Sequence, residues 1–223
     1  MTAPSANLVT GAHAEPIRVV VVDDHELFRN GLVEMLSERG IAVAGVAGSG
    51  EEALESIPRL RPDVALMDLS LPGISGVDVT RRLAAQLPGT RVVALTVMAD
   101  EETLLQAILA GACGYLLKDE SIDEIVAGVQ AAARGNGVIA PQLTRNLMRR
   151  IQTRCTGTAP LARLTARERQ VLDQLVEGCD NAEVAERLYI SQCTAKNHVA
   201  SILVKLGVHN RLQAAVLAVR GWV

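Results

Sequence analysis

Hydrophobic and polar residues alternate regularly over the first part of this chain. Between residues 17 and 134, short runs rich in Val, Ile and Leu alternate with stretches whose apolar residues recur at helical spacing, as Phe28, Leu32 and Leu36 do. The apolar runs occupy residues 17–22, 41–46, 63–68, 91–96 and 114–117. Each run predicts a strand, and each stretch between two runs predicts a helix.

This alternation predicts a parallel β-sheet. Strands that alternate with helices form sheets covered on both faces, and the run VVVV at residues 19–22 suits such burial. We expect a flavodoxin-like α/β domain over residues 17–134, with a five-stranded parallel sheet in the order 2-1-3-4-5. Residues 1–16 are expected to form a disordered tail rather than a signal peptide.

The strand pattern stops after residue 134. We place a linker at 135–160, in which residues 141–152 are compatible with one helix and the segment from 153 is rich in Thr and Gly. Residues 161–223 keep helical spacing and predict an all-α domain of four helices. Within it, a short helix, the turn YISQ and the segment TAKNHVASILVKL predict a helix-turn-helix motif, with Ser191 as the N-cap of its second helix.

The two halves of the chain carry opposite charge. Residues 1–140 contain 10 Lys+Arg and 19 Asp+Glu, whereas residues 141–223 contain 12 and 6, so the net charge of −3 conceals an acidic and a basic half. The acidic half indicates a cation or phosphate site, and the basic half indicates a polyanionic partner. The four cysteines lie at least 14 residues apart, which disfavours a zinc or CxxC motif, and no apolar run reaches the ~20 residues of a membrane helix. We expect a cytoplasmic protein without a membrane partner.

Three acidic residues follow the first and third predicted strands. Asp23 and Asp24 follow the first strand and Asp68 ends the third, so the order 2-1-3 brings all three carboxylates to one edge of the sheet. Carboxylates this close disfavour one another's ionisation. Because Asp23 and Asp24 have no basic neighbour in the sequence, we expect an uncompensated acidic cluster that Mg²⁺ would neutralise.

Two further strands end in groups that suit a phosphoryl group. Thr96 ends the fourth strand with a hydroxyl, and Lys118 follows the fifth with a mobile positive charge. Asp68 leads into the open turn LSLPGISG, which leaves its carboxylate accessible. Together these residues indicate phosphoryl transfer onto a carboxylate.

Residues 17–134 resemble the receiver domain of two-component response regulators through VVDDH, LMDLSLPGISG, ALT and GACGYLLKD. The resemblance implies that Asp68 accepts a phosphoryl group, which Thr96 and Lys118 contact, and that Thr96 and Tyr115 act as switch residues. The Mg²⁺ ligands that it implies are Asp23, Asp24, Asp68 and the backbone carbonyl of Ser70. Asp119 departs from the family pattern, which often has proline after the lysine.

Residues 161–223 resemble the LuxR-type output domain of the NarL/FixJ response regulators through LTARERQVLDQLVEG, NAEVAERLYIS, TAKNHVASILVKLG and NRLQAAV. The resemblance implies sequence-specific DNA binding. Residues at the start of a recognition helix reach base edges, where Lys196 can donate to guanine and Asn197 can pair with adenine. Candidates for phosphate contacts are Lys205, Arg211, Arg167 and Arg169, of which the last two suit a solvated helix face equally well.

The C-terminal segment RLQAAVLAVRGWV carries an apolar stripe of Leu212, Ala215, Val216 and Val219. This stripe is compatible with a packed core helix or with a dimer contact, and we prefer the dimer contact. We further expect the unphosphorylated receiver to mask the output domain and phosphorylation to release it.

These features predict a response regulator that a sensor histidine kinase phosphorylates with Mg²⁺ as cofactor and that binds double-stranded DNA as a homodimer. No enzymatic activity is expected beyond self-phosphotransfer and autodephosphorylation at Asp68. A Mg²⁺-dependent phosphatase is disfavoured because Ser70 stands where such enzymes need an acid. A second alternative is a transcription factor whose receiver-like domain responds to a ligand or a partner rather than to phosphorylation.

Overall fold

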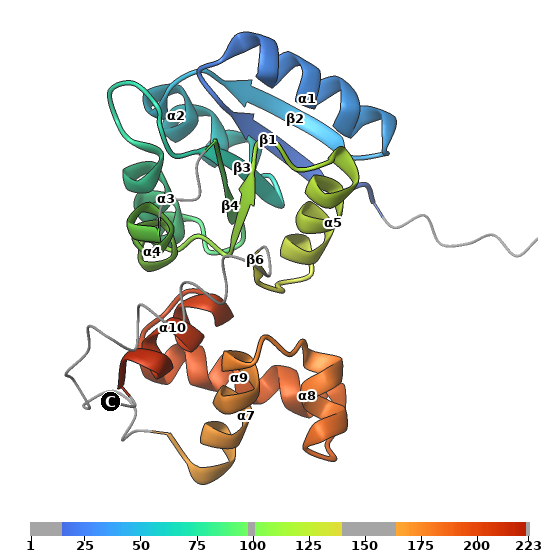
Figure 1. Cartoon of the computed structure of the whole chain (residues 1–223), viewed down its shortest axis with the longest axis vertical. Coiled ribbons are helices and arrows are strands. Elements are labelled where there is room, and N and C mark those ends of the chain that lie inside the picture. The colour runs from blue at the N-terminus through green and yellow to red at the C-terminus, as the bar shows by residue number, and fades with distance from the viewer. Residues whose placement is uncertain (1–14, 98–100, 140–163, 222–223) are drawn as a thin grey trace, which may run out of the picture.

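The computed structural model describes residues 15–97, 101–139 and 164–221, which form two domains (Figure 1). The predicted helix at 141–152, Trp222, Cys155 and most of the predicted tail lie outside these residues. Among the described residues, no single helix is long and apolar enough to cross a membrane, and one bent pair, Gln192–Leu206 with Arg211–Val219, passes by length and composition alone.

The first domain is built on a parallel sheet. Its strands are β1 (Arg18–Val22), β2 (Ala42–Ala47), β3 (Val64–Asp68), β4 (Arg91–Thr96), β5 (Gly114–Leu117) and β6 (Val138–Ile139). They run in the order β2-β1-β3-β4-β5-β6, which confirms the predicted order and adds one strand at the edge. Val138 and Ile139 of β6 lie in the predicted linker, because two apolar residues are too few to reveal a strand.

Helices cover both faces of this sheet, as the alternating pattern requires. They are α1 (Glu26–Glu38), α2 (Gly50–Leu60), α3 (Gly76–Gln86), α4 (Glu101–Ala110) and α5 (Ile122–Ala133). Leu32 and Leu36 of α1 share a buried cluster with Ile125 of α5, whereas α2 and α3 contribute to a separate cluster on the other face. The four valines of β1 are at most 1% exposed, because this strand is central and covered on both faces.

The second domain consists of α7 (Ala166–Val176), α8 (Asn181–Arg187), α9 (Gln192–Leu206) and α10 (Arg211–Gly221) around one buried cluster. This confirms the predicted four-helix domain. Ser191 caps α9 as expected, accepting a hydrogen bond from the backbone N–H of Thr194 at 3.0 Å. Gly207 is the C-cap of α9, and its φ of 67° is a left-handed conformation that glycine adopts without a steric penalty.

α10 joins the two domains. Ala214 and Ala218 pack in the core of the output domain, whereas Leu212, Val216 and Val219 belong to a cluster that includes residues of the receiver. The receiver side of that cluster contains Leu69, Ala94, Leu104, Ala107, Ile108, Ala112 and Tyr115. The predicted apolar stripe is therefore neither confined to the output domain nor exposed, because the receiver of the same chain covers it.

Candidate functional site

The predicted carboxylates converge at one edge of the sheet. Asp23 directly follows β1 and Asp68 ends β3, its neighbour in the sheet, and both side chains are almost completely buried. One ligand atom from each of Asp23, Asp24, His25 and Asp68 lies within 4.8 Å of all the others. Asp24 and His25 are exposed, so the cluster has a buried floor and an open side.

Backbone N–H groups orient the two buried carboxylates. Asp23 Oδ1 accepts a hydrogen bond from the backbone N–H of His25 at 2.9 Å, and Asp68 Oδ1 accepts one from that of Ser70 at 2.9 Å. The guanidinium of Arg29 also donates to the backbone carbonyl of Asp23. In each carboxylate a backbone N–H thus holds Oδ1, and Oδ2 remains to contact another group of the site.

Lys118 lies between these two carboxylates. Its Nζ is 2.6 Å from Asp23 Oδ2 and 2.7 Å from Asp68 Oδ2, and it lies 5.0 Å from the centroid of the Phe28 ring. Burial alone would lower the pKa of Lys118, but the contacts with Asp23 and Asp68 outweigh it and raise that pKa. The expectation of an uncompensated cluster was therefore wrong: the cation is the residue after β5, a strand that β4 separates from β3, and its long side chain reaches both carboxylates at the sheet edge.

The oxygen-rich donor set fits a hard divalent cation. Mg²⁺ prefers oxygen ligands in octahedral geometry and usually takes one or two carboxylates together with water. Asp24 offers an exposed carboxylate beside the buried ones, although His25 Nδ1 lies 2.9 Å from its Oδ1. His25 is the N-cap residue of α1, and its side chain makes no capping hydrogen bond.

The two predicted switch residues lie on neighbouring strands. Thr96 ends β4 beside the site, and its carbonyl accepts a hydrogen bond from the backbone N–H of Lys118 at 2.7 Å. Tyr115 is completely buried in β5, in the cluster that contains Leu212 and Val216 of α10. The side chain of Tyr115 thus belongs to the apolar cluster through which the sheet and α10 pack together.

The loop after Asp68 depends on one glycine. A Cβ at Gly76 would lie 1.9 Å from the carbonyl oxygen of Asp68, far inside any permissible contact. Gly76 starts α3 directly after the N-cap Ser75, so α3 begins in close backbone contact with the end of β3. The start of α3 therefore packs directly against the backbone of the predicted phosphoacceptor, Asp68.

The basic residues of the output domain differ in accessibility. Lys196 and Asn197 are exposed near the start of α9, and Arg169 is exposed on α7. Arg167 donates to the backbone carbonyl of Leu188 at 2.6 Å, which ties α7 to the turn before α9. Lys205 binds both carboxylate oxygens of Glu168 at 2.7 Å.

Glu168 connects α7 to the recognition helix. It is 4% exposed, completes the capping box of α7 with Thr165 and accepts a hydrogen bond from the Ser201 hydroxyl at 2.6 Å. The contacts with Lys205 and Ser201 outweigh burial and lower the pKa of Glu168 to about 2. Sequence reasoning missed this residue, although the spacing TARE carried the capping-box signal.

Arg211 lies in the domain interface rather than on a free surface. It is 8% exposed and donates to Asn136 Oδ1 and to the carbonyl of Cys179, both at 2.8 Å. Its neighbours Asn210 and Gln213 donate to backbone carbonyls of the α4–β5 region, Asn210 to those of Gly111 and Ala112. In this arrangement Arg211 is not accessible to DNA. The sequence signal for this contact was a set of polar positions on an otherwise apolar helix.

Comparison with known proteins agrees with this geometry. Residues 19–130 match the family described as "Response regulator receiver domain", and residues 162–218 match "Bacterial regulatory proteins, luxR family". The chain is 38% identical over 203 residues to the DNA-binding transcriptional activator DevR/DosR of Mycobacterium tuberculosis, covering 91% of this chain and 94% of that protein. It is 41% identical over 207 residues to the probable transcriptional regulatory protein NarL of the same species, covering 92% and 95%.

Two solved structures give the same result. The signal receiver domain of Mycobacterium tuberculosis NarL is 41% identical with a TM-score of 0.54, covering 55% of this chain and all of that one. The response regulator ChrA of a heme-sensing two-component system is 36% identical with a TM-score of 0.52, covering 93% and 98%. The chain belongs to the response regulators of two-component systems that join a receiver domain to a LuxR-type DNA-binding domain, and it is a transcription regulator of that family.

Proposed function

We propose that Asp68 accepts a phosphoryl group from a sensor histidine kinase. A carboxylate oxygen of Asp68 attacks the phosphorus of a phosphohistidine, the P–N bond breaks, and the imidazole leaves with the bonding electrons and takes up a proton. The observation that carries this proposal is the position of Lys118, 2.7 Å from Asp68 Oδ2. A cation so placed stabilises negative charge that develops on the phosphoryl oxygens.

The remaining groups of the site hold the reactants. Asp23, Asp24 and the backbone carbonyl of Ser70 would hold Mg²⁺, which supplies positive charge to the phosphoryl oxygens when it is bound. Thr96 would donate its hydroxyl to one of those oxygens, and Asp68 remains oriented by the backbone N–H of Ser70. The side chain of Ser70 cannot act as the general acid of a phosphatase, which supports transfer without turnover of another substrate. Self-phosphotransfer and autodephosphorylation at Asp68 are therefore the proposed limits of its chemistry.

We propose that the phosphoryl group acts on DNA binding through α10. Phosphorylation replaces the contact between Lys118 and Asp68 with contacts to the phosphoryl oxygens, and Thr96 and Tyr115 adjust to it. Because Tyr115 packs in the same cluster as Leu212 and Val216, its movement disturbs the packing of α10 against the receiver. The released α10 then pairs with that of a second copy, and a homodimer on adjacent half-sites gains effective concentration on DNA.

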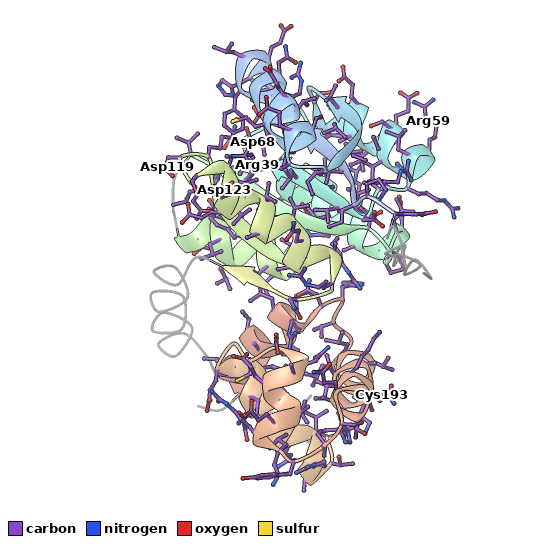
Figure 2. The ribbon with its side chains drawn as sticks, turned by 90° about the vertical axis from the view of Figure 1, so that its right-hand side faces the viewer. Arg39, Arg59, Asp68, Asp119, Asp123 and Cys193 are labelled. Carbon is purple, nitrogen blue, oxygen red and sulfur yellow. The ribbon has the colours of Figure 1, made fainter. Side chains whose placement is uncertain are left out.

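This proposal assigns the masking to α10 rather than to the recognition helix. Lys196 and Asn197 are exposed while the domains are docked. Figure 2 shows that Cys193, near the start of α9, lies in the other domain from Asp68 and far from it. The docked chain can therefore offer one recognition helix to DNA but cannot pair through α10. We place the protein in the cytoplasm, where its kinase and its DNA would both reach it.

Phosphorylation with acetyl phosphate tests the proposed phosphoacceptor. We expect intact-mass spectrometry to detect one added phosphoryl group on the wild type in Mg²⁺, and none on Asp68→Asn or after chelation of the metal. Asp123→Asn, whose side chain is 79% exposed on α5, is the matched control and should be phosphorylated like the wild type. If Asp68→Asn were phosphorylated to the same extent as the wild type, Asp68 would not be the phosphoacceptor.

A further inference from the structure

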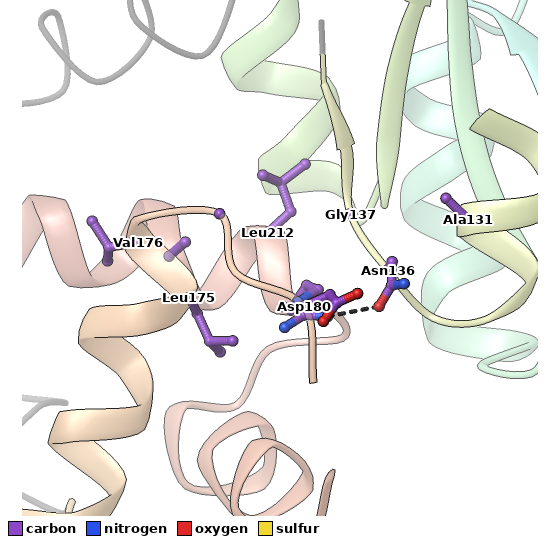
Figure 3. Close-up of a pocket in the computed structure, with 10 residues that line it drawn as sticks. Ala131, Asn136, Gly137, Leu175, Val176, Asp180 and Leu212 are labelled. Atoms are coloured by element: carbon purple, nitrogen blue, oxygen red, sulfur yellow. Dashed lines mark hydrogen bonds between the residues drawn. The ribbon is translucent and has the colours of Figure 1, made fainter. Parts of the chain in front are cut away.

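A cleft of about 320 Å³ lies between the two domains (Figure 3). Its receiver wall consists of Ala131 of α5 with Asn136 and Gly137 before β6. The residues that line it from the output domain are Leu175, Val176, Gly178, Asp180, Arg211, Leu212 and Ala215. Asn136 and Gly137 precede the strand that pairs with the start of β5, whereas Lys118 follows the end of β5, so the cleft is remote from the carboxylate site.

The cleft combines mostly apolar walls with one buried cation. Arg211 is 8% exposed, and its two hydrogen-bond acceptors, Asn136 Oδ1 and the carbonyl of Cys179, are both uncharged. Within the described part of the chain no carboxylate lies within ion-pair distance of Arg211, and burial lowers its pKa. The charges of Asp180 and Glu183 oppose the effect of burial only in part. A buried charge that no carboxylate contacts directly is costly, and a guanidinium has five N–H donors in a planar fork that matches a carboxylate.

Asp180 does not fill this role. Its Oδ1 accepts hydrogen bonds from the backbone N–H groups of Ala182 and Glu183 at 2.8 and 2.9 Å, which caps α8. Oδ1 of that carboxylate is therefore engaged by its own helix and no ion pair with Arg211 forms, although its charge acts on Arg211 and restricts a bound anion to the Arg211 side of the cleft. The remaining lining from Ala131, Leu175 and Leu212 offers nothing to a fully hydrated ion such as inorganic phosphate.

We propose that this cleft binds a small organic carboxylate with an apolar ring or chain, whose carboxylate pairs with Arg211. The apolar part lies against Leu175, Val176 and Leu212. The volume is at the lower end of the range for small-molecule sites, so the ligand is of the size of one aromatic ring with a carboxylate.

Such a ligand favours the docked arrangement. The cleft that holds it is lined by Ala131, Asn136 and Gly137 of the receiver as well as by Arg211 of the output domain, so the ligand binds the docked form more tightly and loses its receiver contacts when the domains separate. At a free concentration ten times its dissociation constant it shifts the docking equilibrium by at most about tenfold. The resulting loss of DNA affinity rests on the proposed release of α10, whereas binding itself does not.

Titration of the full chain with benzoate tests the site, with benzamide as the uncharged analogue and acetate as the ion without a ring. We expect saturable calorimetric binding of benzoate with a dissociation constant on the order of 1 mM, and binding at least tenfold weaker for both analogues. Arg211→Met should weaken benzoate binding at least tenfold. Ala131→Leu, which keeps Arg211 and fills the cleft from the receiver side, should weaken it to the same extent.

Three results would overturn the site: no saturable binding of benzoate to the wild type, unchanged binding to Arg211→Met, or unchanged binding to Ala131→Leu. Asp68→Asn should bind benzoate like the wild type, so that failure of phosphorylation cannot be mistaken for failure of the cleft. In a DNA titration of the unphosphorylated wild type, benzoate should lower the affinity and benzamide should not. Saturable binding with no effect on DNA affinity would overturn the regulatory part of the proposal.

Discussion

The side-chain amide of Asn210, in the output domain, donates a hydrogen bond to the backbone carbonyl of Gly111 in the receiver at 2.8 Å. A second bond reaches the carbonyl of Ala112 at 3.2 Å. Asn210 is 7% exposed and precedes α10, so the helix that we propose for dimerisation is fixed at its start to the α4–β5 turn. These two hydrogen bonds hold α10 against the receiver in the proposed masked state.

Asn210→Asp should open the interface without unfolding α10. The Oδ1 atom that accepts from the backbone N–H of Gln213 at 2.9 Å is retained, but the two donors become an acceptor that faces two carbonyls. A buried hydrogen bond lost in this way costs about 1–3 kcal/mol. We expect DNA titrations to show a higher affinity for the unphosphorylated variant than for the unphosphorylated wild type. Asn30→Asp makes the same charge change at an exposed position of α1 and should have no effect on DNA affinity. Unchanged DNA affinity for both variants would show that Asn210 does not contribute to the masking.

Replacement of two helical glycines by alanine should have opposite effects. At Gly31, inside α1, a Cβ meets no atom within 4 Å, so Gly31→Ala should stabilise the protein by about 0.5–1 kcal/mol through helix propensity alone. At Gly76 a Cβ would lie 1.9 Å from the carbonyl oxygen of Asp68, and Gly76→Ala should destabilise it by more than about 2 kcal/mol. Urea unfolding measures both changes. A stabilising Gly76→Ala would contradict the close approach of α3 to β3.

Glu168→Gln should reduce stability in a pH-dependent way. The pKa of Glu168 is about 2 in the folded chain, below its ordinary 4.5, so the charged carboxylate stabilises the fold above about pH 4.5. That contribution is lost as the pH falls through about 2. We therefore expect the difference in melting temperature between wild type and variant to be full at pH 7 and to shrink below pH 4.5. Glu183→Gln, in the exposed capping box of α8, is the matched control and should show a smaller difference at pH 7.

Lys196→Ala and Asn197→Ala should each weaken specific DNA binding by about 1–3 kcal/mol and affect non-specific binding much less. Arg169→Ala should instead weaken both alike and reduce the salt dependence by about one counterion, as expected for a phosphate contact. Fluorescence anisotropy with an operator and a scrambled duplex at several salt concentrations distinguishes these cases. Equal losses on both duplexes for Lys196→Ala and Asn197→Ala would make them phosphate contacts.

The receiver site was predictable because the topology of a parallel sheet is strongly constrained. Once the strand order was inferred, the positions of Asp23, Asp68 and Lys118 at strand ends placed them at one edge. The pairing of Lys118 with both acids was missed, because sequence neighbours alone cannot show which cation reaches a buried carboxylate. β6 was missed because two residues carry no periodicity.

The role of α10 shows a different limit of the sequence. The apolar stripe through Leu212, Val216 and Val219 indicated that one face needed a partner, but a hydrophobic pattern does not identify that partner. Arg211 and Lys205 were candidates for DNA contacts because basic residues on a basic domain are usually solvated. Their partners, Asn136 and Glu168, lie far away in sequence and are found only once the helices are packed.

We propose that a phosphoryl group on Asp68 releases α10 for dimerisation on DNA. Light scattering and DNA titration, with and without acetyl phosphate and Mg²⁺, test it most directly in the wild type and in Asp68→Asn. Only the phosphorylated wild type should dimerise and gain DNA affinity, and the other three samples should match one another. Equal mass and equal affinity in all four samples would contradict the switch.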